Sequence, residues 1–347
     1  MRIVHLLNAI NDSGDGISNV AVDLACDQAA RGHHVMLIST GGTLEHLLHK
    51  TGVETARVNL TRRTPFGIAA SVIQLRRIVT EFTPDVIHVH TMTAALLARF
   101  AKPTVRLVAT VHNEYQPGVS LMRVADVVVG NSQAVSAAMV KRGVRRGKVR
   151  TVLNGVGGSL RRSTVRVEKS PLVDEKTIVA LGAVSRRKGA DVLLDAFAEV
   201  DARVRGAKLL FVGHIDWPEV TTPHEFKDYM KNVQFLGYDS QPEKYLGFGT
   251  VFAIPSRKDP FPLALLEARL AGCAIVGTAV DGIPEALDEG EAGLLVPAED
   301  PLALAQALVS ILQDSELRHR LASAAQKGAA RYTVARMSED YLKLYGR

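Results

Sequence analysis

The stretch Asn154–Val173, NGVGGSLRRSTVRVEKSPLV, interrupts an otherwise regular sequence pattern. It is rich in Gly, Ser and Arg, whereas short β-branched runs alternate with helical stretches on both sides of it. A chain of 347 residues with 47% hydrophobic content is long enough to bury two cores. We therefore predict two α/β domains, residues 1–160 and 174–331, joined by a linker at 161–173 and followed by a final helix at 332–347 that crosses back onto the first domain.

The expected strands read as continuous apolar runs, which is typical of parallel sheets covered by helices on both faces. The first series is Ile3–Leu7, Val35–Ser39, Val86–His90, Leu107–His112, Val127–Val129 and Val149–Leu153. The second is Ile178–Leu181, Leu209–Val212, Val233–Leu236, Val251–Ile254, Ala274–Val276 and Leu294–Val296. The pattern predicts two tandem, doubly wound Rossmann-like domains. Because ligands bind beyond the carboxyl ends of such strands, we expect the domains to face a central cleft.

The net charge of +6 is unevenly distributed. Residues 1–160 hold 18 Lys and Arg against 10 Asp and Glu, a net charge of +8, and the remainder has a net charge of −2. The densest basic runs are Arg62-Arg63 and Lys141–Arg150. This field raises the local concentration of anionic partners and tilts the acceptor toward an anionic or lipid-linked molecule. We interpret the basic runs first as a solvated basic surface, with peripheral contact with an anionic membrane as the alternative. We expect no nucleic acid partner.

Cysteine usage and hydropathy indicate the compartment. The two cysteines, Cys26 and Cys273, are far apart and have no metal-ligand spacing. No apolar run reaches the ~18 residues that a membrane span requires, and the first residues do not have the pattern of a signal peptide. We expect a cytoplasmic protein, with the inner face of the membrane as an alternative location.

The first loop, Asn11–Asn19, follows a strand and opens a helix, so its glycines, Gly16 among them, allow backbone amides to approach a phosphate or a sugar. The sequence does not match a dinucleotide-binding fingerprint, because Asn19 occupies the third glycine position and the second strand ends in Ser39-Thr40 without the acid that would hold a ribose. A tight turn without a ligand is the alternative. We place Asn11 on the acceptor side.

Three histidines lie at expected strand ends. His88 and His90 point the same way by the two-residue period of a strand, and His112 ends the next motif. A metal site of the three is disfavoured, because no acid or cysteine lies at supporting spacing. Satisfied buried histidines are the alternative for His88 and His90. His112 is the best functional candidate, as a donor to a sugar hydroxyl or a developing charge, and we place His90 and Asn113 on the acceptor side.

Two further motifs belong to the second domain. In Gly182–Gly189, GAVSRRKG, the cations Arg186, Arg187 and Lys188 suit a diphosphate, with exposed loop charges as the alternative. In Ser256–Ala268, SRKDPFPLALLEA, a helix begins near Leu263 between two acids, Asp259 and Glu267. Their backbones are on the order of 10 Å apart, which suits one long ligand better than a glycosidase pair.

These motifs together resemble the retaining glycosyltransferases of family 4, which have the GT-B fold. The similarity lies in DPFP, Glu267-Ala268, DGIPE, DVIHVH, TVH, NGV, Lys188-Gly189 and FLG, which fall in the family's order and span nearly the whole chain. The resemblance implies a nucleoside diphosphate sugar as donor, held chiefly by the second domain, and an acceptor held by the first.

The resemblance also implies individual roles. Glu267 would bind the ribose hydroxyls, Lys188 the phosphates, and Asp259 the sugar together with the backbone after it, at Phe261, Pro262 and Leu263. Gly237 and Tyr238 would lie beside the nucleobase, and His112 is the strand-end histidine. We expect His112, Lys188 and Asp259 to be the catalytic residues.

Two positions depart from the family pattern. Ala183 stands where the family usually has an Arg, and we hypothesise that Arg186 or Arg187 supplies the missing charge. Asp259 replaces the usual Glu and is shorter by one methylene, which would shift the sugar preference.

The sequence thus predicts a retaining, metal-independent glycosyltransferase without a cofactor, acting in cell-surface polysaccharide, glycolipid or glycoconjugate biosynthesis. Metal independence is expected from the absence of an Asp-x-Asp motif. A nucleotide-sugar epimerase of the same fold and a catalytically silent sugar-nucleotide-binding protein are the alternatives. The nucleobase, the sugar, the acceptor and the oligomeric state stay open.

Overall fold

The chain forms two compact units. The computed structural model describes residues 1–102, 104–162, 168–217 and 228–346. Unit 1 comprises Met1–Arg162 and Tyr332–Arg347, and unit 2 comprises Ser163–Arg331. The expected linker at 161–173 lies partly outside the described residues, at 163–167.

Unit 1 contains a parallel sheet with the order β3-β2-β1-β4-β5-β6-β7. Its strands are β1 Arg2–Leu6, β2 His34–Ser39, β3 Glu54–Arg57, β4 Val86–Val89, β5 Arg106–Val111, β6 Val127–Gly130 and β7 Val149–Thr151. Its helices are α1 Gly16–Ala30, α2 Glu45–Lys50, α3 Pro65–Phe82, α4 Met92–Ala101, α5 Gln133–Lys141 and α11 Val334–Tyr345. The buried strand residues pack against these helices, as the continuous apolar runs require.

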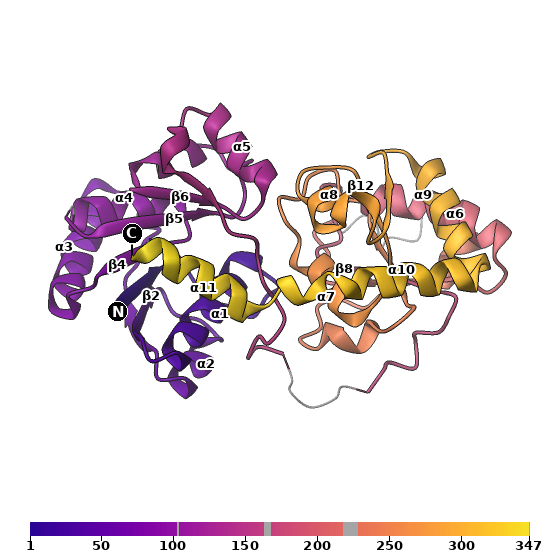
Figure 1. Ribbon diagram of the computed structural model, residues 1–347, viewed down its shortest axis with the longest axis horizontal. Helices are drawn as coiled ribbons and strands as arrows, with labels where there is room; N and C mark the ends of the chain where they lie inside the picture. Colours follow the sequence, from indigo (N-terminus) through magenta and orange to yellow (C-terminus); the bar gives the residue numbers. More distant parts are fainter. Residues whose placement is uncertain (103, 163–167, 218–227, 347) are drawn as a thin grey trace. The chain divides into compact units, whose positions relative to one another are not determined.

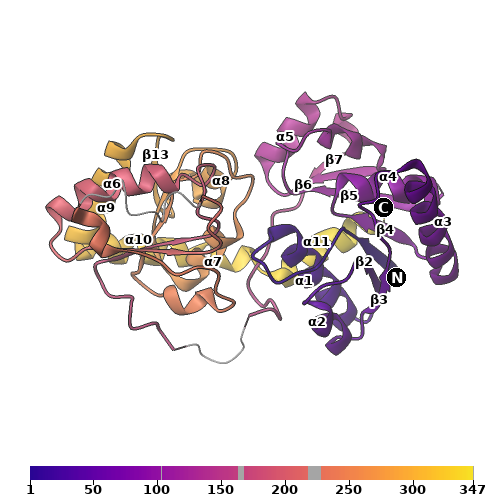
Figure 2. The same cartoon turned by 180° about the vertical axis from the view of Figure 1, so that it is seen from behind.

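The last helix, α11, packs against α1 in unit 1 (Figures 1 and 2). Where the chain re-enters this unit, the backbone amides of Val156 and Gly157 donate hydrogen bonds to the Tyr332 carbonyl oxygen, at 2.8 and 3.0 Å. A Cβ atom at Gly155 would lie only 2.1 Å from the Thr333 carbonyl oxygen, so this crossing requires glycine.

Unit 2 repeats the architecture with the strand order β10-β9-β8-β11-β12-β13, again parallel. Its strands are β8 Thr177–Leu181, β9 Lys208–Val212, β10 Val233–Phe235, β11 Val251–Ile254, β12 Ala274–Thr278 and β13 Leu294–Val296. Its helices are α6 Ala190–Arg203, α7 Leu263–Ala271, α8 Ile283–Ala286, α9 Pro301–Gln313 and α10 Ser315–Lys327. The predicted class of two parallel Rossmann-like α/β domains is confirmed.

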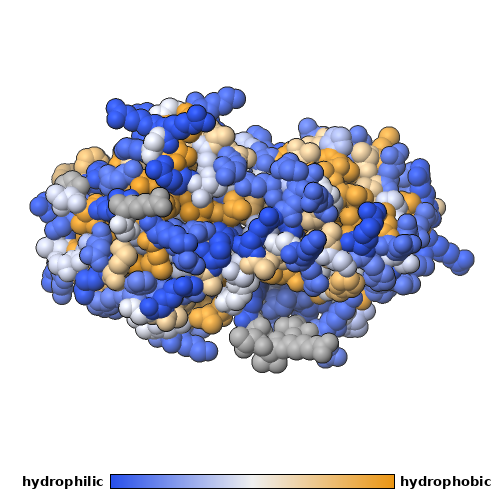
Figure 3. All heavy atoms as spheres, in the orientation of Figure 1, coloured by the Kyte–Doolittle hydropathy of each residue, from blue (hydrophilic) through white to orange (hydrophobic). Residues whose placement is uncertain are grey.

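The surface is largely hydrophilic on the face drawn in Figure 3, with hydrophobic side chains in separate patches. Among the described residues, no helix has both the length and the apolar character needed to cross a bilayer.

Candidate functional site

The topology of unit 2 brings two predicted site residues together. Strand order reverses direction between β8 and β11, which are paired neighbours, and such a switch point is where open α/β sheets bind ligands. Lys188 lies in the loop after β8, and Asp259 in the loop after β11. Lys188 Nζ lies 2.6 Å from Asp259 Oδ2. Residues 71 positions apart therefore form one charged pair at the carboxyl edge of the sheet.

Gly189 allows the Lys188 loop to come this close. Its φ is +71°, and a Cβ atom there would lie 1.9 Å from the Pro255 carbonyl oxygen at the end of β11. A residue with a side chain would push the two loops apart. The Lys-Gly sequence thus has a structural reason: the lysine supplies the charge and the glycine its position.

Asp259 is almost fully buried, with 4% of its surface exposed, and is held from several directions. Ser256 Oγ donates to its Oδ2 at 3.2 Å, in addition to Lys188. The Asp259 backbone amide donates to Asp281 Oδ2 at 2.7 Å. A carboxylate with such partners stays in place, which is what binding a ligand in one geometry requires.

The start of α7 lies next to Asp259 in the chain and has no side-chain cap. Its N-cap residue is Pro262, whose side chain makes no hydrogen bond to the helix amides, whereas Asp300 and Asp314 cap α9 and α10. Phe261 and Pro262 are buried, and Leu263 is the first helical residue. A helix start without a side-chain cap favours anions, because no side chain satisfies its first amides at the positive end of the helix dipole.

Glu267 lies on α7, four residues or about one turn beyond Leu263, and is half-buried. Its neighbours Leu266 and Ala268 face the core. Neither of the two predicted acids points fully into bulk solvent.

Arg186 and Arg187, which lie in the same loop as Lys188, already have partners elsewhere in unit 2. The Arg186 guanidinium carbon lies 4.9 Å from the centre of the Trp217 ring and its Nη1 lies 3.6 Å from Asp191 Oδ2, yet its side chain remains 71% exposed. Arg187 donates from Nη1 to the Lys258 carbonyl at 3.0 Å. Arg186 is therefore the more available of the two for a ligand.

Gly237 and Tyr238 follow β10 in unit 2. The Gly237 carbonyl accepts a hydrogen bond from the Gly213 amide at 2.8 Å. Tyr238 stacks on His214, with ring centres 4.8 Å apart and an interplanar angle of 3°. The sequence analysis did not single out His214, although its position just after β9 marks it as a carboxyl-edge residue.

Unit 1 has a polar pocket of about 270 Å³ at the carboxyl ends of β1 and β4. Its lining includes Asn8, Asn11, Ser13, Asp15, Thr91, Thr93 and Gln116. Asn11, which we expected on the acceptor side, thus lines this pocket. Gly16 is different: it begins α1, whose following amides, at Ile17 and Ser18, both donate to the Asp15 carboxylate at 3.2 Å. An anion at this helix start would meet a carboxylate.

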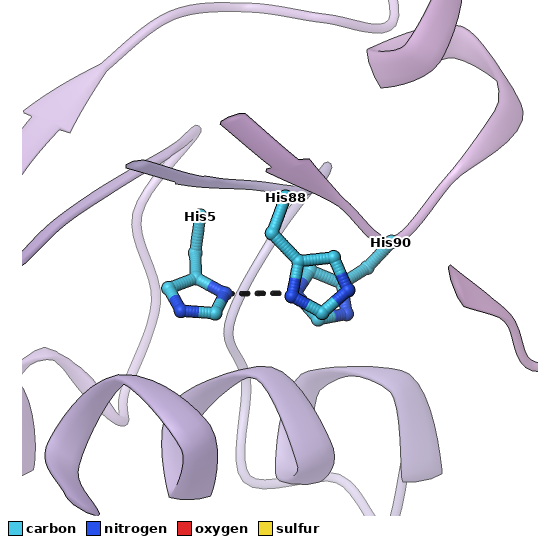
Figure 4. A group of neighbouring side chains, drawn as sticks. All are labelled: His5, His88 and His90. Atoms are coloured by element: carbon cyan, nitrogen blue, oxygen red, sulfur yellow. Dashed lines mark hydrogen bonds between the residues drawn. The ribbon is translucent and has the colours of Figure 1, made fainter. Parts of the chain in front are cut away.

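Four histidines of unit 1, namely His5, His88, His90 and His112, form one cluster. His5, His88 and His90 lie side by side, with ring centres between 4.2 and 5.3 Å apart (Figure 4). His112, which follows β5, bonds to His90. Burial lowers the pKa of His5 to about 4, although the hydrogen bond that His5 donates to Gln28 acts in the opposite direction. Burial also lowers the pKa of His112 to about 4, although the Asp15 carboxylate acts to raise it. The pKa values of His88 and His90 also lie well below the usual range because of burial.

The ring nitrogens of His5, His88 and His90 lie within 4.8 Å of one another, a spacing that would suit a metal ion. However, all six of these nitrogens are engaged in hydrogen bonds. His5 bonds Gln28 and His90, His90 bonds His5 and His112, and His88 bonds Thr110 and Tyr345. A metal would have to break this network, so the donor set fits satisfied histidines better than ligands.

His90 and Asn113, which we expected on the acceptor side, both have hydrogen-bond partners within unit 1. His90 is only 2% exposed and lies inside the cluster. The Asn113 side-chain oxygen accepts a hydrogen bond from the Tyr115 backbone amide at 3.0 Å. His112 is half-buried and is the cluster member nearest the surface.

Comparisons with known proteins identify the family to which both units are similar. The family model described as Glycosyltransferase Family 4 matches residues 14–157, and the one described as Glycosyl transferases group 1 matches residues 175–314. The chain is 26% identical to phosphatidyl-myo-inositol mannosyltransferase of Mycobacterium leprae over 369 residues, covering 99% of this chain and 96% of the relative. It is 30% identical to D-inositol 3-phosphate glycosyltransferase of Corynebacterium urealyticum over 242 residues, covering 64% of this chain and 56% of the relative.

A solved structure shows the same fold. HepE of Anabaena, crystallised in complex with UDP and glucose, superposes with a TM-score of 0.80 at 20% identity, covering 100% of this chain and 99% of that chain. The family models match one unit each and together account for most of the chain. The protein therefore belongs to the family 4 glycosyltransferases with the GT-B fold.

Proposed function

We propose that this protein transfers a sugar from a nucleoside diphosphate sugar to an acceptor hydroxyl, with retention of the anomeric configuration and without a metal ion. The observation that carries the proposal is the pair of Lys188 and Asp259 at the switch point of unit 2, beside the uncapped start of α7. The solved structure of HepE with UDP and glucose supports a nucleoside diphosphate sugar as donor.

In this proposal the donor's parts are divided among the residues of unit 2. Lys188 binds the diphosphate, Asp259 the sugar and Glu267 the ribose. An ammonium group has three N–H donors, so Lys188 can bond to a phosphate and to Asp259 at once. The backbone at Phe261, Pro262 and Leu263 completes the phosphate and sugar contacts, with Gly237 and Tyr238 beside the nucleobase and Arg186 or Arg187 as the additional cation.

The proposed reaction is a same-face displacement at the anomeric carbon. The bond from this carbon to the phosphate oxygen breaks, a bond to the acceptor oxygen forms, and the acceptor proton passes to the departing phosphate. Negative charge develops on the phosphate, where Lys188 and the start of α7 stabilise it. Asp259 is an unsuitable covalent nucleophile, because its carboxylate is already engaged by Lys188 and Ser256.

For the acceptor we propose an anionic or lipid-linked molecule bound by unit 1, at the polar pocket that includes Asn11. Both curated relatives are named for inositol compounds that carry a phosphate group. The net charge of +8 on residues 1–160 attracts such an acceptor.

We also propose that α3 contacts an anionic membrane. Phe66 and Ile73, seven residues apart on one face of α3, are 90% and 70% exposed. Arg62-Arg63 precede this helix, and Arg76-Arg77 extend the same exposed side. Exposed apolar side chains flanked by arginines are suited to the boundary between the lipid headgroups and the acyl chains of a membrane.

A thermal-shift screen followed by product analysis tests the proposal. Nucleoside diphosphates and their sugars should raise the melting temperature, because a ligand of the folded state stabilises it by mass action. With the donor so identified, we expect sugar transfer that resists a chelator, and a product whose anomeric configuration by NMR equals that of the donor. Conversion of the donor without an acceptor would instead indicate an epimerase, and binding without turnover a silent protein.

A further inference from the structure

Four side chains of unit 1 form a continuous hydrogen-bonded series that ends at His112; we call Gln28, His5, His90 and His112 the histidine relay. Gln28 Oε1 lies 2.8 Å from His5 Nε2, His5 Nδ1 lies 3.0 Å from His90 Nε2, and His90 Nδ1 lies 3.2 Å from His112 Nε2. Gln28 and His5 are fully buried and His90 is 2% exposed, so bulk water does not compete for these bonds.

The first member sets the direction of the relay. An amide oxygen only accepts, so His5 donates from Nε2 and, because it is neutral, has a lone pair at Nδ1. His90 then donates from Nε2 to His5 and accepts at Nδ1 from His112 Nε2. Each neutral imidazole has a single N–H, so all three rings are held in the same tautomer.

Helix α11 holds Gln28 in this orientation. Its amide nitrogen donates to the Tyr345 hydroxyl at 3.4 Å, and this hydroxyl lies 2.7 Å from His88 Nδ1. Because the amide nitrogen faces Tyr345, the amide oxygen faces His5.

The relay leaves one group of His112 available. Its Nε2 hydrogen is engaged by His90, and the described residues provide no hydrogen-bond partner for its Nδ1. His112 is half-buried, in contrast to the other members. It therefore presents a lone pair, which complements a hydroxyl hydrogen and not a phosphate oxygen, since a phosphate oxygen is itself an acceptor.

We propose that Gln28, acting through His5 and His90, is a positioning residue that fixes the tautomer of His112, so that His112 Nδ1 accepts a hydrogen bond from a hydroxyl of the sugar or of the acceptor. This inference rests on the proposed function, in which His112 contacts a substrate. It reverses the role expected from the sequence, where His112 was a donor. It also explains why a glutamine, which cannot become charged, lies buried at the far end of the series.

The test is the tautomeric state of the histidines in the full-length protein. In protein labelled with ¹⁵N-histidine, two-bond ¹H–¹⁵N correlation spectra distinguish a proton on Nδ1 from one on Nε2. Single His→Asn variants at the three positions assign the signals. We expect His5, His90 and His112 each to carry the proton on Nε2 at neutral pH. A proton on Nδ1 of His112, or an equal mixture of tautomers, would overturn the proposal.

The variant Gln28→Leu removes the amide oxygen that directs the relay, and Gln28→Met does the same with a more adaptable side chain. In the variant that circular dichroism shows to be folded, we expect His112 to populate both tautomers and kcat/KM for sugar transfer to fall roughly tenfold, the effect of about one lost hydrogen bond. The matched control is Tyr341→Phe, which removes a buried hydroxyl of α11 that bonds Thr110 at 2.7 Å and leaves the relay intact. It should keep the single tautomer.

The tautomer spectra need no turnover, so they remain decisive even if the protein transfers no sugar, a result that would contradict the proposed function alone. A folded Gln28→Leu protein with altered tautomers but the wild-type kcat/KM would show that the relay does not position His112 for a substrate.

Discussion

Lys188 Nζ and Asp259 Oδ2 lie 2.6 Å apart across the switch point of the unit 2 sheet. The Asp259 side chain is 6% exposed and that of Lys188 is 23% exposed, so the pair is poorly screened by solvent. Each residue thereby holds the other in place, at the position where we propose that a donor phosphate and its sugar meet. The same pairing makes the two residues interdependent: removing either partner leaves the other with an unbalanced charge.

The variant Lys188→Ala should lower turnover by about 10²–10³, because it removes the cation that we propose stabilises charge on the leaving phosphate. Lys188→Arg retains the charge and should recover part of the loss. The matched control is Lys208→Ala, which breaks an exposed Lys–Asp pair of the same unit with Asp174 at 2.7 Å. Initial-rate measurements at saturating donor, on variants that unfold at similar temperatures, make the comparison. Near-normal turnover of Lys188→Ala would remove this residue from the mechanism.

The variant Glu267→Gln should weaken donor binding by roughly ten- to hundredfold, because a hydrogen bond to a charged group contributes about 1.5–3 kcal/mol. Calorimetric titration of ribo- and 2′-deoxynucleoside diphosphates gives the sharper comparison. Wild type should prefer the ribonucleotide, and Glu267→Gln should lose most of that preference. Glu316→Gln, at an exposed position of α10, is the control. Equal discrimination in wild type and Glu267→Gln would place the ribose elsewhere.

The double variant Arg186→Ala/Arg187→Ala should reduce both donor affinity and turnover, since these residues are proposed to replace the family Arg at Ala183. The single variants should differ. Arg186 is 71% exposed, whereas Arg187 donates to the Lys258 carbonyl and supports the loop. We therefore expect Arg186→Ala to raise the donor dissociation constant more, and Arg187→Ala to lower the melting temperature more. Unchanged affinity and turnover in the double variant would refute the replacement.

Much of the fold is encoded in local patterns. Every expected strand overlaps an observed one, the helix at Leu263 begins at the expected residue, and α11 lies within the final helix expected at 332–347. One observed strand, β3 at Glu54–Arg57, was not predicted from the sequence. It lies at the edge of the sheet, and its residues ETAR are half-buried or exposed, so they lack the apolar run that marks an inner strand.

The candidate site was predictable in part for the same reason. Lys188 and Asp259 lie in loops whose sequence motifs are local, whereas the relay depends on contacts between distant segments. His5 sits within an apolar run and Gln28 within a helix, where neither stands out. Gln28 is fully buried next to Tyr345, 317 residues away, and no local signal predicts that contact.

The variant Arg62→Ser/Arg63→Ser should weaken binding to anionic vesicles. Each arginine near a negatively charged surface contributes about 1 kcal/mol, so the pair should cost roughly thirtyfold in affinity. Co-sedimentation with phosphatidylglycerol vesicles, compared with phosphatidylcholine vesicles, measures the effect. Phe66→Ala should also weaken binding, but with little dependence on salt.

The control for the membrane prediction is Arg145→Ser/Arg146→Ser, which makes the same change of charge at two exposed residues of the other basic run. It should bind vesicles nearly as well as wild type. Equal losses in the two double variants would mean that net charge alone attracts the lipid and that α3 is not the contact surface.

As the pH is lowered, the folding stability of unit 1 should fall at a higher pH than that of unit 2. Burial lowers the pKa of His5 to about 4 from an ordinary 6.5. The unfolded chain therefore takes up a proton between pH 6.5 and 4 that the folded chain does not bind, so stability falls as the pH drops through this window and levels off below it. At about 1.4 kcal/mol per pH unit, His5 alone accounts for about 3 kcal/mol. The lowered pKa values of His88, His90 and His112 act in the same direction.

Hydrogen exchange measures this difference within one sample. Protection of amides in β1 and β4, corrected for the intrinsic rate at each pH, should decrease between pH 7 and pH 5. Amides in β8 and β11 serve as the internal control, because the described part of unit 2 contains no buried histidine. The variant His5→Gln should make β1 less sensitive to pH, and His319→Gln, at an exposed position, should not. Parallel losses of protection in both sheets would show that the histidine cluster is not what acid destabilises.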